Sequence, residues 1–77
     1  ERHVLRKLHA EAGYNPYSFE LLMGEQFLSE EKPAEALTHF ERAAKIRPNA
    51  PGVQLRLGEA HLYLKDWHEA ENAFLRI

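Results

Sequence analysis

The sequence predicts an all-α fold of tandem antiparallel helix-turn-helix hairpins, and three observations lead to this prediction. Prolines and glycines divide the 77 residues into five short segments, and apolar residues recur within these segments at helical spacing. No segment alternates apolar and polar residues with the β-branched enrichment of a strand. The same small and large residues also return after 34 positions, as from Gly24 to Gly58.

The first two helices are expected before residue 30. One helix should lie near residues 2–12, where four apolar residues share a face before Gly13 supplies a C-terminal cap. These residues are Val4, Leu5, Leu8 and Ala12. A second helix should run from Pro16 to about Ser29, because Asn15 is a good N-cap and proline is favoured at the first helical position.

Three further helices are expected in the rest of the chain. Pro33 opens the third helix, and Pro51 opens the fourth after a stretch crowded with helix breakers. Asp66 with Glu69 three residues later resembles a capping box. The fifth helix should therefore begin at Trp67 and continue to the end of the sequence.

A shift of 34 residues superposes the second and third helices on the fourth and fifth. The identical pairs are Leu21 and Leu55, Gly24 and Gly58, Glu25 and Glu59, Leu28 and Leu62, Glu35 and Glu69, Ala36 and Ala70, Phe40 and Phe74, and Arg42 and Arg76. A glycine inside a helix costs roughly 1 kcal/mol relative to alanine, so its return at a matched position indicates a packing role. Gly24 and Gly58 are expected to face the partner helix near Ala36 and Ala70, with the repeated phenylalanine filling the neighbouring space.

This pattern resembles the tetratricopeptide repeat, which has a 34-residue period and a signature of spaced small and large residues. The matching residues are Met23, Gly24, Ala36, Phe40, Ala43 and Pro48 in the first copy, and Leu57, Gly58, Ala70 and Phe74 in the second. The resemblance implies a right-handed α-α superhelix, with one repeat at residues 17–50 and a second at residues 51–77 that is truncated at its C-terminal end. Residues 1–14 would be a leading helix, which could close a preceding repeat.

Composition argues against several classes of function. Ten Lys and Arg against twelve Asp and Glu give a net charge of −2, which does not favour nucleic-acid binding. The sequence lacks the run of about 20 apolar residues that membrane insertion needs. It also lacks cysteine, which excludes disulfides and thiolate metal sites. We therefore expect no nucleic acid, no membrane insertion and no metal or other cofactor.

The resemblance also implies a partner-binding groove, because arrays of this family have a concave side lined by the first helix of each repeat. The residues expected to line it are Ser18, Leu21, Glu25, Leu28, Ser29, Leu55, Glu59, Leu62 and Tyr63. The leucines among them could instead pack successive hairpins together. Glu25 and Glu59 are expected near solvent, since glutamate is seldom buried unpaired, and would favour apolar partners that carry lysine or arginine. Such binding should weaken with salt.

We therefore expect a protein–protein interaction scaffold that binds a peptide or helix of a partner, and not an enzyme. The five histidines include no pair three or four residues apart, and neither a metal motif nor a phosphate-binding glycine motif is present. The alternative is a docking or regulatory segment of a larger enzyme whose catalytic residues lie elsewhere.

Two further expectations concern single side chains. His61 stands where the first repeat has Phe27, so burial would disfavour its charged form and loosen the second repeat at mildly acidic pH. Leu75 and Ile77 at the end of the sequence could cause self-association.

Overall fold

Four helices, with no strand, account for residues 15–77, which are the residues described by the structure, a computed structural model. They are α2 (Pro16–Ser29), α3 (Pro33–Ile46), α4 (Pro51–Tyr63) and α5 (Trp67–Leu75). The predicted all-α class is confirmed. The helix expected at residues 2–12 and the leading segment 1–14 lie outside the described residues.

Helix starts follow the predicted signals in three of four cases. Proline occupies the first turn of α2, α3 and α4. The side chain of Asn15 accepts a hydrogen bond from the Ser18 backbone N–H at 3.2 Å, which confirms the N-cap of α2. The prediction of a capping box at the start of α5 is wrong, because the Asp66 side chain makes no capping hydrogen bond. Its carboxylate lies instead 3.3 Å from Nδ1 of His61. Helix α5 also ends at Leu75, two residues before the predicted end.

The turns inside the two hairpins have the same backbone conformation. Glu31 and Lys65, which are 34 positions apart, have positive φ angles of 61° and 63°. The next residue in each turn donates its N–H back to the helix: Lys32 to the carbonyl of Phe27 at 2.9 Å, and Asp66 to that of His61 at 2.8 Å. This is the Schellman arrangement, in which the left-handed position is usually glycine. The hairpins therefore repeat in backbone conformation as well as in sequence.

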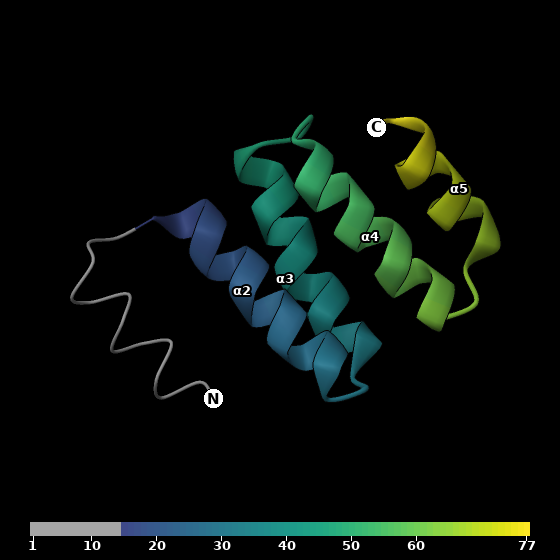
Figure 1. Cartoon of the computed structure of the whole chain (residues 1–77), viewed down its shortest axis with the longest axis horizontal. Helices are drawn as coiled ribbons and strands as arrows, with labels where there is room; N and C mark the ends of the chain where they lie inside the picture. Colours follow the sequence, from purple (N-terminus) through teal and green to yellow (C-terminus); the bar gives the residue numbers. More distant parts are fainter. Residues whose placement is uncertain (1–14) are drawn as a thin grey trace.

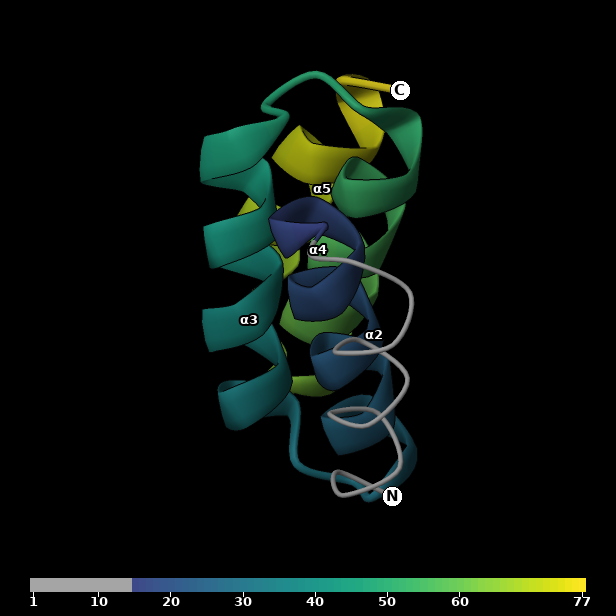
Figure 2. The same cartoon turned by 90° about the vertical axis from the view of Figure 1, so that its left-hand side faces the viewer.

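Helices α2 and α3 form one antiparallel pair, and α4 and α5 form a second that lies beside it (Figure 1). Seen from the side of α2, α3 lies beside α2, with α4 and α5 behind them (Figure 2). Helix α4 packs against all three other described helices. The principal core cluster consists of Met23, Phe27, Ala36, Phe40 and Ala60. Since Ala60 belongs to α4, the first hairpin completes its core with a residue of the second.

The repeated glycines lie in the contact between the paired helices, as predicted, but the group that covers them is different. A Cβ added at Gly24 would lie 2.9 Å from Cζ of Phe40 and closer still to two other ring atoms. At Gly58 it would lie 2.6 Å from Cζ of Phe74. The phenylalanine ring therefore sits directly on the bare backbone. Ala36 and Ala70, whose methyl groups were expected in that place, are also buried.

Candidate functional site

The side-by-side packing of α2 and α4 creates a hollowed surface, which we call the α2–α4 groove. It consists of two adjoining hollows of about 400 and 310 Å³. The lining residues are Glu25, Leu28 and Ser29 of α2, and Arg56, Glu59, Leu62 and Tyr63 of α4. The two hollows share Leu28, Glu59 and Tyr63, so they form one continuous surface. Six of the nine residues expected to bind a partner meet here.

The other three expected residues lie elsewhere. Ser18 is exposed in the first turn of α2, where its N–H is bound by Asn15. Leu21 is partly buried against the principal core, and Leu55 is exposed at 39% without lining either hollow. The nine residues expected to bind a partner are thus divided between the groove, a packing position and exposed surface.

The four repeated leucines do not have equivalent surroundings. Leu21 and Leu28 are partly buried and pack against the core cluster. Leu55 and Leu62, at the matched positions of the second hairpin, are exposed at 39% and 43%. In the first hairpin the leucines at these positions contribute to packing, which is the alternative role that was considered for the predicted groove leucines.

A cation that the sequence analysis did not identify stands between the two predicted glutamates. Nε of Arg56 donates to Oε2 of Glu25 at 2.9 Å, and its Nη1 donates to Oε1 of Glu59 at 3.1 Å. The side chains of Glu25 and Glu59 are 37% and 39% exposed, so both remain near solvent, as expected. They are not an unpaired acidic strip, however, and the three groups together carry one net negative charge.

The ion pairs also affect the guanidinium itself. The hydrogen bond to Glu25 raises the pKa of Arg56 above its ordinary value, although partial burial acts in the opposite direction. The guanidinium therefore stays charged at every pH at which the fold would be studied. Arg56 joins the first hairpin to the second through Glu25, which lies 31 residues earlier.

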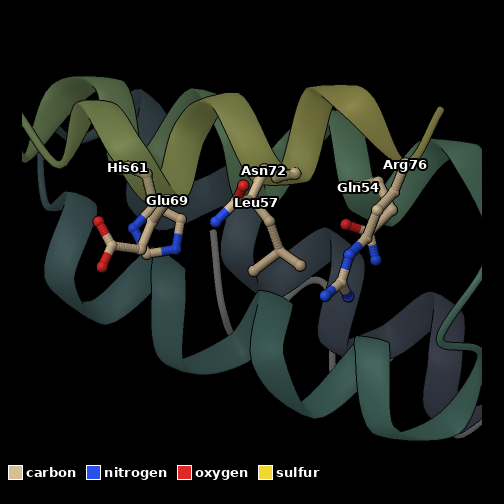
Figure 3. Close-up of a pocket in the computed structure, with 7 residues that line it drawn as sticks. Gln54, Leu57, His61, Glu69, Asn72 and Arg76 are labelled. Carbon is tan, nitrogen blue, oxygen red and sulfur yellow. The ribbon is translucent and has the colours of Figure 1, made fainter.

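A smaller hollow of about 220 Å³ lies between α4 and α5 (Figure 3). It is lined by Gln54, Leu57 and His61 of α4, by Glu69, Asn72 and Ala73 of α5, and by Arg76 directly after α5. Buried Gln54 uses its Nε2 to donate to the carbonyl of Pro48 at 2.7 Å, so this amide holds the linker before α4. The volume is below the range of about 300 to 1,000 Å³ that is typical of small-molecule sites.

His61 is largely covered, but its imidazole is not confined to an apolar seam. Nδ1 lies 3.3 Å from the Asp66 carboxylate. The expected loosening of the second repeat at mildly acidic pH stays a prediction.

Within the described part of the chain, no group of three or more histidine, aspartate or glutamate side chains is placed to hold a metal ion. None of the described helices combines the length and the apolar character that crossing a membrane requires.

Comparison with known proteins identifies one similarity. A family model described as tetratricopeptide repeat matches residues 27–77, which is more than half of the chain. Searches of curated proteins and of solved structures found no match. The matched region begins near the end of α2 and includes α3, α4 and α5.

Proposed function

Because the chain belongs to the tetratricopeptide repeat family, whose repeats are generally non-catalytic protein-interaction scaffolds, we propose that the α2–α4 groove binds a peptide or helix of a partner protein. The observation that carries this proposal is the meeting of Leu28, Leu62 and Tyr63 around three charged side chains on adjoining helices. Apolar walls with a few placed polar groups are typical of binding sites.

The charges of the groove favour a particular kind of partner. Glu25 and Glu59 outnumber Arg56, so a lysine or arginine of the partner would add a cation to a surface with one net negative charge. Apolar side chains of the same segment would occupy the hollow beside Leu28 and Leu62. We therefore favour a partner segment that combines basic and apolar residues. The same net charge disfavours a nucleic-acid phosphate backbone.

A pair of synthetic peptides tests this proposal. One alternates leucine with lysine, and the other alternates leucine with glutamate. Fluorescence anisotropy should detect binding of the lysine peptide, weakening as the salt concentration rises because partly exposed charges are screened. Amide shifts in an NMR titration should concentrate at Glu25, Leu28 and Glu59. Equal binding of both peptides, or shifts confined to α5, would contradict a groove of this specificity.

A matched pair of aromatic substitutions controls for non-specific adhesion. Tyr63 lines the groove and Trp67 does not, yet their exposed fractions are similar at 67% and 62%. Tyr63→Ala should weaken binding of the lysine peptide about tenfold, the scale of losing one aromatic contact, while Trp67→Ala should leave it unchanged. If both variants lose binding to the same extent, the peptide is adhering to exposed aromatic surface.

A further inference from the structure

The hollow between α4 and α5 corresponds to a place in the first hairpin that is filled by an imidazole ring. There, the ring of His39 on α3 stacks on the Phe27 ring of α2, with 5.3 Å between the centroids and 16° between the planes. Its Nδ1 lies 2.8 Å from Oε1 of Glu20, and both side chains are largely covered. The first hairpin thus holds one imidazole between two residues of its first helix.

The second hairpin keeps this arrangement but lacks the imidazole. A shift of 34 positions relates the three residues of the first hairpin to three residues that line the hollow. The pairs are His39 and Ala73, Phe27 and His61, and Glu20 and Gln54. A methyl group therefore replaces the ring on the second helix, while the first helix still presents an aromatic ring and a side-chain oxygen.

Gln54 presents an unused hydrogen-bond acceptor at the hollow. Its side chain is buried, and its Nε2 donates to the carbonyl of Pro48 at 2.7 Å. The remaining atom, Oε1, accepts no hydrogen bond from the residues that the structure describes, and it retains contact with solvent. Figure 3 shows this oxygen on the side of Leu57. It corresponds to the Glu20 oxygen that contacts the imidazole in the first hairpin.

The hollow lies on the side of the second hairpin that faces the first. Leu57 lines it and also packs against the principal core cluster, which α2 and α3 largely supply. Gln54 lines it and holds the linker between α3 and α4. It shares no lining residue with the α2–α4 groove. The hollow is thus a second, separate place for a ligand.

The charges and the size of the hollow restrict what fits it. Glu69 and Arg76 lie at opposite ends, so their charges balance, and a neutral group is suited to the middle (Figure 3). The volume of about 220 Å³ suits one side chain better than a free small molecule. We propose that this hollow binds the neutral imidazole of a partner protein's histidine, stacked on His61 and donating its N–H to Oε1 of Gln54.

Capped amino acids measure this recognition on the intact chain. Histidine with an acetylated amine and an amidated carboxyl is titrated at about pH 8, above the ordinary histidine pKa of about 6.5. Amide shifts in NMR spectra should concentrate at Leu57, His61 and Ala73. Capped histidine methylated on either ring nitrogen lacks the N–H and should bind about three- to tenfold more weakly, the effect of one hydrogen bond. Equal binding of the methylated forms, or tighter binding of capped phenylalanine or tryptophan, would overturn the proposal.

A substitution that restores the first-hairpin arrangement locates the site. Ala73→His should fill the hollow with its own ring and abolish binding of capped histidine. Ala73→Ser is the matched control, because it leaves the hollow open and should bind as the natural chain does. Circular dichroism verifies folding, and Ala73→Met fills the same space if the histidine variant does not fold. Retained binding in a folded variant with a filled hollow would overturn the proposed location.

A short peptide distinguishes a protein partner from a free heterocycle. One histidine flanked on both sides by alanines should bind at least as tightly as capped histidine, and with shifts at the same residues. If capped histidine binds and the peptide does not, the rim excludes a polypeptide backbone. That result would overturn the assignment of the occupant to a partner protein.

This proposal goes beyond the α2–α4 groove, and the two fail in different ways. Tyr63→Ala should weaken the lysine peptide of the groove experiment and leave capped histidine unaffected. Ala73→His should have the opposite pattern. Shifts caused by capped histidine that fall on Glu59 and Tyr63 would mean that the ring binds in the groove, and they would overturn the second site without affecting the first.

Discussion

At the scale of single residues, the two repeated glycines differ in the burial of the phenylalanine ring that covers each of them. Phe40, which lies on Gly24, is completely buried, whereas Phe74, which lies on Gly58, is only partly buried. Because a buried ring has no free space into which to move, an added methyl group is tolerated less well at the first glycine than at the second.

This difference predicts the effect of alanine substitution. Gly24→Ala should lower the free energy of unfolding by about 1 to 3 kcal/mol, since overpacking outweighs the gain in helix propensity. Gly58→Ala should cost less, because the Phe74 ring can shift toward solvent. Urea unfolding of both variants measures the difference.

Gly52→Ala is the matched control, since its added Cβ would meet only the Tyr17 hydroxyl, at an ordinary 3.7 Å. This change should be neutral or stabilising by up to about 1 kcal/mol. Equal losses at positions 24 and 58 would show that the burial of the ring does not determine the cost.

Arg56 illustrates a limit on what single residues reveal before a structure is known. Its contact with Glu59 lies within one helix and could have been noticed from the three-residue spacing. Its contact with Glu25 spans 31 residues and depends on how α4 rotates against α2, which no local pattern specifies. The same limit applies to Asp66, whose spacing to Glu69 matches a capping box although its carboxylate turns to His61.

At the scale of the helices, the starts of all four described helices and the end of α2 agree with the prediction. Proline at the first turn restricts the backbone there and is a local signal that tertiary packing rarely overrides. The left-handed residues that end α2 and α4 could not be predicted, because Glu31 and Lys65 stand where glycine usually marks this conformation. Packing of the paired helices imposes the turn on residues that do not prefer it.

Glycine at these two turns should therefore stabilise the protein. Glu31→Gly and Lys65→Gly should each raise the free energy of unfolding by about 0.5 to 1 kcal/mol, because glycine adopts a positive φ without steric cost. Thermal or urea unfolding measures the change. Glu41→Gly, at an exposed position inside α3, should instead lower stability by about 1 kcal/mol. A loss at all three positions would indicate that the left-handed turn carries no strain.

At the scale of the whole molecule, the described helices do not share the core equally. Helix α4 contacts α2, α3 and α5, and supplies Ala60 to the principal cluster. Helix α5 has nine residues and packs against α4 alone among the described helices. Stability should therefore decline from the first hairpin toward α5, as in other repeat proteins whose units contact only their neighbours.

Hydrogen exchange should show this gradient directly. Amides of α5 should exchange through a local opening that costs less free energy than global unfolding, while those of α3 should exchange only with the whole fold. Phe74→Leu should increase exchange in α5 and leave α3 nearly unchanged, whereas Phe40→Leu should increase it in both. Equal opening free energies in α3 and α5 would mean that the two hairpins unfold as one cooperative unit.

The candidate site was predictable only in part, because it depends on how whole hairpins pack against each other. Six of the expected residues meet in the α2–α4 groove because the repeat places them at matched positions on neighbouring helices. Leu21 and Leu55 diverge although they occupy the same position in the repeat, since Leu21 packs against the principal core cluster whereas Leu55 is exposed among the described residues. Sequence identity between repeats specifies a position within a hairpin, but not the neighbours of that hairpin.

The row formed by Glu25, Arg56 and Glu59 alternates in sign along the direction in which the hairpins succeed one another. Each additional hairpin built on the pattern of the second would bring one arginine and one glutamate, and these cancel. A gene that gains or loses such hairpins by recombination would then change the length of the protein without accumulating charge along this row.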